Sequence, residues 1–223
     1  LGIKLYTRPI GHEVVSAIDM FGKTFGAGDI KLEPKTLTIE NMQPRIRMRV
    51  LMEYSNEFGA LLLGTGNKSE VSVGYCTLYG DCSAGLNPLG DLYKMEVYAL
   101  ARWYNEWRQD TIIPKSIIDK APSAELWYGQ KDSDSLPPYP GLDAILRLYL
   151  EGDYLTSDER RECLKTMEVC PIGEVNRVLR LIDRAEFKRY QSPPILRVHR
   201  RSFGAGRNIP LAHSHVPNIT NLL

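Results

Sequence analysis

The stretch from Ala60 to Lys94 restricts the fold of this chain more than any other. It opens with a continuous apolar run, Ala60–Leu63, which is typical of a strand buried on both faces of a parallel sheet. The run ends on Gly64–Gly66, and the polar tetrad Asn67–Glu70 follows. In an open α/β sheet, ligands bind at this place, outside the carboxyl end of a strand and near the next helix N-terminus. The alternative interpretation is an ordinary strand-to-helix connection with a capping Asn or Ser.

The composition indicates one globular domain over residues 1–223. The chain has 28 basic and 27 acidic residues, which argues against a general polyanion-binding surface. No apolar run approaches the length of a membrane span. The four cysteines form no C-x-x-C pair, which predicts reduced thiols in a cytosolic protein. The sequence begins at Leu1 instead of Met, inside a predicted strand, so we expect a further segment upstream.

The N-terminal third carries a basic helical ridge. Three segments come first: a strand over Leu1–Ile10, an amphipathic helix over Glu13–Phe25 and a loop over Gly26–Pro34. Asn41, Arg45 and Arg49 then recur at i, i+4 and i+8, which places them along one side of a helix. Because an interior proline breaks helical hydrogen bonding, we expect the regular helix to begin near Pro44, with Asn41 in an entry turn. A solvated basic face is the alternative for this ridge.

The rest of the chain is predicted to be mostly helical. Helices are expected over Leu92–Trp107, Leu142–Leu150, Ser157–Met167 and Glu174–Phe187. Asp91 is the expected N-cap of the first, so Lys94 lies in its first turn, where a cation opposes the helix dipole and indicates a functional use. Gln130–Pro140 is predicted to be a mobile surface loop. Residues 208–223, with His213 and His215, are predicted to be a flexible tail.

A basic cluster lies near the C-terminus. Between Arg177 and Arg207 the sequence carries nine basic residues against two acids, Asp183 and Glu186. The cluster is the most nucleic-acid-like feature of the chain, although a phosphate-rich cofactor or a partner subunit would suit it equally. The balanced overall charge favours a dinucleotide over nucleic acid.

Six blocks occur in the order LLLGTGNKSE, GYCTLYGD, PLGDLYK, PSAEL, DSLPPY and FKRYQSPP, with ENMQPRIRM before them. In this order they resemble the ATP-dependent NAD synthetases, and most closely the synthetase domain of the glutamine-dependent, two-domain enzymes. The resemblance implies an α/β fold of the ATP-pyrophosphatase type, an open parallel sheet with helices on both faces. The family's Ser-Gly-Gly-x-Asp-Ser phosphate loop precedes the region that matches Leu1, and these 223 residues contain no such motif. We therefore expect an N-terminally truncated domain that is inactive alone.

The resemblance also implies a reaction. The nicotinate carboxylate of deamido-NAD attacks the α-phosphate of ATP in the presence of Mg²⁺, and ammonia derived from glutamine then displaces AMP to give NAD. A cytoplasmic homodimer with a glutaminase domain upstream is implied, with no nucleic-acid or membrane partner. Two alternatives stay open: another ATP pyrophosphatase with a different substrate, and a non-catalytic fragment or basic-tailed nucleotide- or RNA-binding module.

Each residue that matches a family motif takes an implied role. The resemblance assigns catalysis to Lys94 and Asp81, and a place near Mg²⁺ to Glu70. ATP contacts fall on Thr65, Lys94 and Ser123. Contacts to deamido-NAD fall on Asn41, Arg45, Glu70, Tyr75, Cys76, Thr77, Leu78, Asp81 and Lys188. Core packing is the alternative for Tyr75 and Leu78, and a simple turn acid is the alternative for Asp81.

Overall fold

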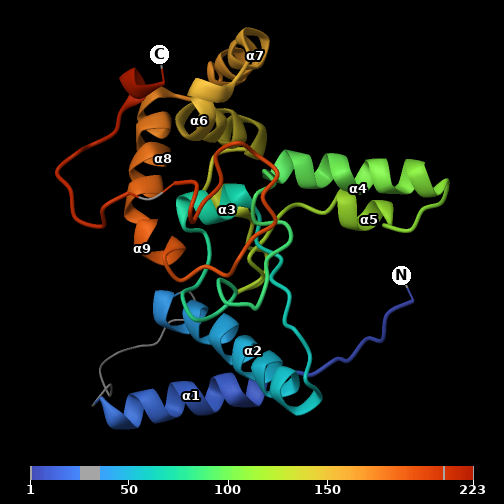
Figure 1. Cartoon of the computed structure of the whole chain (residues 1–223). Helices are drawn as coiled ribbons and strands as arrows, with labels where there is room; N and C mark the ends of the chain where they lie inside the picture. The colour runs from blue at the N-terminus through green and yellow to red at the C-terminus, as the bar shows by residue number, and fades with distance from the viewer. Residues whose placement is uncertain (1, 26–35, 208, 223) are drawn as a thin grey trace.

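The computed structural model describes residues 2–25, 36–207 and 209–222. Figure 1 shows its helices as a main cluster with α1 and α2 set to one side. None of the described helices is long and apolar enough to cross a membrane. The α-helices within these ranges are α1 (Gly11–Thr24), α2 (Leu37–Phe58), α3 (Lys68–Val73), α4 (Lys94–Arg108), α5 (Lys115–Ile118), α6 (Tyr139–Glu151), α7 (Ser157–Met167), α8 (Ile172–Arg184) and α9 (Glu186–Arg189). Short 3-10 segments are η1 (Asp132–Asp134), η2 (Gly152–Tyr154) and η3 (Ile219–Asn221).

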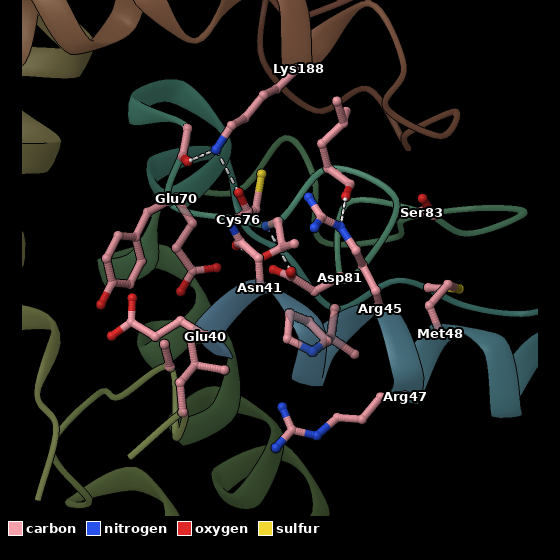
Figure 2. Close-up of a pocket in the computed structure, with 18 of the residues that line it drawn as sticks. Glu40, Asn41, Arg45, Arg47, Met48, Glu70, Cys76, Asp81, Ser83 and Lys188 are labelled. Carbon is pink, nitrogen blue, oxygen red and sulfur yellow. Dashed lines mark hydrogen bonds between the residues drawn. The ribbon is translucent and has the colours of Figure 1, made fainter. Parts of the chain in front are cut away.

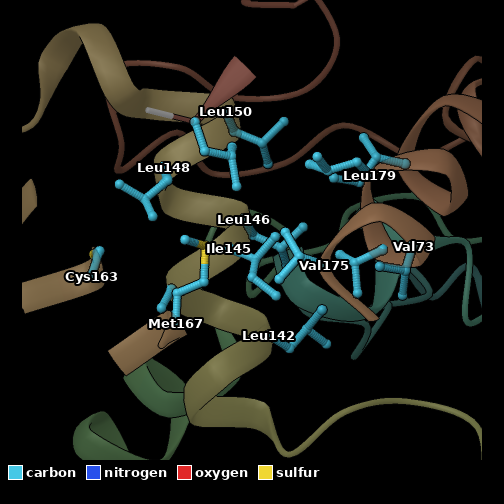
Figure 3. Packing of buried hydrophobic residues seen from close by; sticks show 14 of the residues in the cluster. Val73, Leu142, Ile145, Leu146, Leu148, Leu150, Cys163, Met167, Val175 and Leu179 are labelled. Atoms are coloured by element: carbon cyan, nitrogen blue, oxygen red, sulfur yellow. The ribbon is translucent and has the colours of Figure 1, made fainter. Parts of the chain in front are cut away.

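Helix α6 forms the centre of the hydrophobic core. Its Leu142, Ile145 and Leu146 are fully buried, and α7, α8, α3 and α4 pack around it (Figures 1 and 3). The helix predicted over Ser157–Met167 is confirmed with those bounds, because its apolar periodicity and Thr156 cap are both local signals. The helix predicted over Glu174–Phe187 is divided into α8 and α9 at Ala185.

The predicted sheet is present in the described chain only as isolated bridges. Leu63 pairs in parallel with Leu86, and Asn87 pairs in parallel with Ile195. The parallel direction agrees with the prediction, but the pairing does not extend into strands. Leu61 and Leu63 are 67% and 53% exposed, so the predicted burial of this run on both faces is wrong.

The N-terminal predictions need two corrections. Residues 2–10 form no strand, because the described chain offers no partner segment to which they could hydrogen-bond. The regular part of α2 begins at Leu37 instead of near Pro44, so Asn41 lies within the helix. Pro44 is buried in close contact with Gly80, where an added side chain would lie 3.0 Å from the proline ring. This packing offsets the lost backbone hydrogen bond. The loop predicted over Gly26–Pro34 lies outside the described residues.

Two segments predicted to be mobile are packed at least in part. Within Gln130–Pro140, Asp132, Leu136 and Tyr139 are buried. Within 209–222, Leu222 is buried in the core, and the Ile219 amide donates to the Asn176 side chain at 2.9 Å. Composition predicted both segments to be mobile, but a few apolar side chains suffice to attach each to the core.

Helix α3 buries a lysine. The Lys68 side chain is 1% exposed, and its Nζ lies 2.9 Å from Asp91 Oδ1 and 2.7 Å from Glu151 Oε1. It also donates to the Arg201 carbonyl at 2.8 Å. Because a buried cation needs partners, this pairing joins α3 to the end of α6 and to the segment before α4.

Asp91 does not cap α4, which corrects the prediction. The helix begins at Lys94, and the buried Asp91 Oδ2 accepts hydrogen bonds instead from the Val198 and His199 amides and from Ser202 Oγ. Asp91 therefore holds the C-terminal segment against Lys68. The partners of this carboxylate are more than a hundred residues away in sequence, so local pattern could not reveal them.

We predict that Lys68→Met destabilises the protein by about 3–5 kcal/mol, because it leaves two buried carboxylates without their cation. The measurement is urea denaturation followed by circular dichroism. Lys165→Met, at an exposed position of α7, is the matched control and should change stability by less than about 0.5 kcal/mol. Equal effects of the two substitutions would contradict the structural role of Lys68.

His199 links the same network to α4. Its Nε2 lies 2.9 Å from Glu96 Oε2 and its Nδ1 lies 3.3 Å from Glu151 Oε2. Hydrogen bonds to Glu151 and Glu96 raise the pKa of His199 to about 9. Burial alone would raise the pKa of Glu151, but hydrogen bonds from His199, Lys68 and Tyr93 lower it to about 2.

The raised pKa of His199 predicts a loss of stability in alkaline solution. The imidazolium contributes fully below pH 6.5, and its contribution disappears as pH rises through about 9. The free energy of unfolding should therefore fall by on the order of 2 kcal/mol across this window. His199→Gln should flatten that part of the profile, measured by denaturant titrations at several pH values. An unchanged slope in the variant would contradict the assignment.

Candidate active site

One pocket brings the predicted site residues together. It has a volume of about 800 Å³ and lies between α2, the loop that follows α3, the loop before α6, and α9. Figure 2 shows side chains from these segments facing one another across it. All twelve residues singled out from the sequence line it: Asn41, Arg45, Thr65, Glu70, Tyr75, Cys76, Thr77, Leu78, Asp81, Lys94, Ser123 and Lys188. Their chemical roles stay predictions.

Helix α2 supplies one wall. Asn41 Oδ1 accepts a hydrogen bond from Thr77 Oγ1 at 2.8 Å, and Arg45 Nε donates to the Leu78 carbonyl at 3.1 Å. Arg49, the third member of the predicted ridge, is exposed and pairs with Glu53 on its own helix. The ridge is therefore divided: its first two members hold the pocket loop, and its third is a solvated surface residue.

The loop from Tyr75 to Cys82 forms the opposite wall. Thr77 donates its amide to Asp81 Oδ1 at 2.8 Å, and burial raises the pKa of Asp81. Cys76 and Cys82 form a disulfide with a Cα–Cα distance of 5.8 Å, so the prediction of reduced thiols is wrong for this pair. The two cysteines are six residues apart, outside the C-x-x-C spacing, and a tight loop brings them together. Among described cysteines, Cys163 and Cys170 are free.

Lys188 closes the pocket from α9. Its Nζ donates to the Gly74 carbonyl at 2.8 Å and to the Cys76 carbonyl at 2.7 Å (Figure 2). Burial and the nearby Arg45 lower the pKa of Lys188, whereas Asp81 opposes this shift. The lysine therefore places a partly desolvated cation beside the pocket loop.

Lys94 and Glu70 meet at the N-termini of two helices. Lys94 is the first residue of α4, and its Nζ lies 2.9 Å from Glu70 Oε1, with both side chains 18% exposed. The same Nζ lies 5.1 Å from the centre of the Tyr139 ring. Glu70 Oε2 accepts from the Asn67 amide at 3.1 Å, which completes a capping box for α3. A cation and a carboxylate thus face the pocket from fixed backbone positions.

Thr65 and Ser123 line the pocket from two loops. Thr65 is exposed, and Ser123 Oγ accepts from the Glu125 amide at 3.0 Å. Since each hydroxyl still has a proton to donate, both can hydrogen-bond an anion.

Sequence analysis missed the acidic side of the pocket. Glu40, Asp132 and Asp134 line it in addition to the predicted Glu70 and Asp81. The signal was available, because ENMQPRIRM begins at Glu40 and DSLPPY begins at Asp134. Cations and carboxylates therefore face each other across the pocket, in keeping with the balanced charge of the chain.

Tyr75 is placed deep in this acidic part. Its hydroxyl is buried without a hydrogen-bond partner among the described residues. Burial and the neighbouring Asp132 raise the pKa of the Tyr75 phenol, which keeps it neutral and able to donate. Tyr75 packs against the hydrophobic core, as the core-packing alternative expected, and it also lines the pocket.

The basic cluster between Arg177 and Arg207 does not act as one surface. Arg189 and Arg207 are buried and lie 2.6 Å and 3.5 Å from Glu186, and Arg177 pairs with Glu174 at 2.6 Å. Among the described residues that line the pocket, Lys188 is the one member of the cluster. Part of the apparent nucleic-acid signal is therefore internal pairing, whereas Arg180, Arg184, Arg197 and Arg200 are exposed.

Among the described residues, no group of three or more His, Cys, Asp or Glu side chains could hold a metal ion. Within the described part of the chain, Glu70 therefore has no set of neighbouring carboxylates that would form a complete site. Mg²⁺ commonly binds through one or two carboxylates together with the phosphates of a nucleotide, so this donor set fits a nucleotide-bound ion.

Comparison with solved structures defines the class of fold. A glutamine-dependent NAD(+) synthetase from Cytophaga hutchinsonii matches 96% of this chain and 34% of its own with a TM-score of 0.65 at 22% identity. An NH3-dependent NAD synthetase from Campylobacter jejuni matches 82% of this chain and 63% of its own with a TM-score of 0.54 at 27% identity. The predicted α/β fold of the ATP-pyrophosphatase type is thereby confirmed.

Sequence comparison then gives the family. Residues 2–192 match the family model described as NAD synthase. A glutamine-dependent NAD(+) synthetase of Synechocystis sp. is 47% identical over 222 residues, which cover 97% of this chain and 37% of that protein. The chain belongs to the NAD synthase family. It spans about a third of the length of the curated relatives it matches.

Lys188→Met should loosen the pocket loop, because both carbonyls that it contacts would lose their donor. We expect amide hydrogen exchange across residues 75–82 to accelerate on the order of tenfold, measured by mass spectrometry. Lys165→Met again serves as the control. Unchanged exchange in the Lys188 variant would show that the disulfide and the turn hydrogen bonds hold the loop without the lysine.

Proposed function

We propose that the pocket binds ATP and deamido-NAD and converts the nicotinate carboxylate into the amide of NAD. The carboxylate oxygen attacks the α-phosphorus of ATP and pyrophosphate leaves. Ammonia then attacks the carbonyl carbon of the adenylate and AMP leaves. The observation that carries the proposal is the meeting of Lys94 and Glu70 at two helix N-termini inside a pocket that also holds Arg45 and Lys188.

In this proposal, separate sets of residues bind ATP and deamido-NAD. Lys94, Thr65 and Ser123 donate to the phosphates of ATP, where negative charge develops as pyrophosphate leaves. Arg45 and Lys188 bind the dinucleotide side, with Lys188 already partly desolvated at the loop carbonyls. Most of the catalysis comes from holding two anionic substrates in a reactive orientation, because the entropy cost of bringing them together is then met on binding and no longer adds to the activation barrier.

The acidic wall suits the other part of deamido-NAD. A nicotinate ring joined to ribose is a pyridinium cation, and Glu40 and Asp132 line the pocket near Tyr75. Asp81 lines it from the loop between Tyr75 and Cys82. Tyr75 stacks on this ring or donates its free hydroxyl to the substrate. Asn41, Cys76, Thr77 and Leu78 complete the wall as backbone and packing contacts.

Mg²⁺ accompanies ATP in this proposal, and Glu70 is the residue that would hold it. When bound, the ion supplies charge neutralisation for the leaving pyrophosphate. The ion pair with Lys94 holds the Glu70 carboxylate at the pocket wall.

The source of ammonia and the assembly are proposed on the same basis. Curated relatives are named glutamine-dependent, so we infer that glutamine supplies the ammonia through a glutaminase domain. We also infer a cytoplasmic location. A homodimer would cover the exposed apolar side chains of α1 and α2, among them Val15, Met20, Leu51 and Phe58. The RNA-binding alternative is weakened, because Arg189 and Arg207 are turned inward.

Lys94→Ala tests the proposal. In the full-length protein with ATP, Mg²⁺ and deamido-NAD, we expect pyrophosphate release to fall on the order of a hundredfold, because a phosphate-binding cation is lost. Lys165→Ala, exposed on α7, is the control and should keep the normal rate. Normal release by Lys94→Ala, with a folded protein, would remove Lys94 from the mechanism.

A further inference from the structure

The N-terminus of α4, where Lys94 lies, is held by a side chain from another helix. Asp143 of α6 is 5% exposed, and its Oδ2 accepts a hydrogen bond from the Met95 amide at 2.9 Å. Met95 is the second residue of α4, so this amide is one of those that a helix leaves without an internal partner. A carboxylate at this position also interacts favourably with the helix dipole.

The other oxygen of the same carboxylate holds α3. Asp143 Oδ1 accepts from Ser69 Oγ at 2.5 Å, and Ser69 Oγ accepts in turn from the Lys94 amide at 2.9 Å. Ser69 is fully buried and precedes Glu70 in the chain. One carboxylate thus fixes the backbone of Lys94 through Ser69 and that of Met95 directly.

The consequence is a fixed distance between two pocket residues. Glu70 follows Ser69 on α3, and Lys94 begins α4, so both backbones are tied to Asp143. Their side chains meet in the pocket at 2.9 Å. Asp143 is not among the described residues that line the pocket. It therefore acts on this pair through Ser69 and the Met95 amide.

Burial of this carboxylate is costly. Burial raises the pKa of Asp143 to about 6, although hydrogen bonds from Ser69 and Met95 and the charge of Lys94 act against the rise, whereas Glu96 adds to it. Asp143 lies beside the apolar core that α6 forms with its neighbours, where a carboxylate is costly to bury. The hydrogen bonds to two helices account for an aspartate here.

We propose that Asp143, acting through Ser69, is a positioning residue that sets Lys94 and Glu70 in register for the phosphates of ATP. This inference rests on the proposed function of Lys94. It predicts that Asp143 affects ATP use far more than deamido-NAD binding, because Arg45 of α2 and Lys188 of α9 lie on other walls of the pocket.

The experiment is a double-mutant cycle in the full-length protein, with steady-state kinetics for both substrates. Asp143→Asn keeps the shape of the side chain but replaces one accepting oxygen with an amide that cannot accept. We expect kcat/KM for ATP to fall about tenfold and the KM for deamido-NAD to stay within about twofold. In a Lys94→Ala background, Asp143→Asn should cause a further loss of less than about twofold, because most of its effect passes through the lysine and only the placement of Glu70 remains.

The controls separate positioning from general damage. Asp183→Asn removes a carboxylate of α8 that contacts Tyr149 of α6 at 3.4 Å, and it should leave both kinetic constants within about twofold. Ser69→Ala serves as a second variant if Asp143→Asn does not fold, and its smaller loss should also shrink to less than about twofold in the Lys94→Ala background. If Asp143→Asn or Ser69→Ala reduces the rate by the same factor in the Lys94→Ala background as in the unsubstituted protein, the inference is overturned. The role of Lys94 in the proposed function would then still stand. A normal rate for Lys94→Ala alone would overturn the proposed function and this inference with it.

Discussion

The buried charge of Lys68 is the interaction on which the rest of the structure depends. A lysine cannot remain in a protein interior without partners, so Asp91, Glu151 and the Arg201 carbonyl must all converge on it. These partners belong to the segment before α4, the end of α6 and the C-terminal segment. Their convergence fixes the position of α3, and the pocket loop begins at the end of α3.

The pocket itself is built from segments that are distant in sequence. Helix α2 contacts the loop after α3 through Asn41 and Arg45, and α9 contacts the same loop through Lys188. The loop is also closed on itself by the disulfide and by the Thr77–Asp81 hydrogen bond. It therefore has little freedom before any ligand binds, which is the condition for preorganised binding.

Sequence alone predicted local features well and long-range partners poorly. The helix at Ser157–Met167 was predicted with its bounds, because a cap and an apolar stripe are contained in its own residues. The pocket residues were recognised because short blocks retain their order along the chain. Asp91 was misassigned because an acid before a helix suits a cap, and nothing local indicates a buried lysine as its partner. The disulfide was missed for a related reason, since loop closure is a property of the fold.

The polar residues at the start of α3 connect the buried interior of the protein to the pocket. Lys68 and Ser69 are the first residues of α3, and both side chains point into the interior instead of the solvent. Glu70, the next residue, faces the pocket. Apolar residues at the first two positions would pack, but they could not fix the rotation of so short a helix. Hydrogen bonds and ion pairs are directional, so they set where Glu70 points as well as where α3 lies. Burying these groups has a desolvation cost, but their directional bonds hold the short helix α3 in a single orientation beside the pocket.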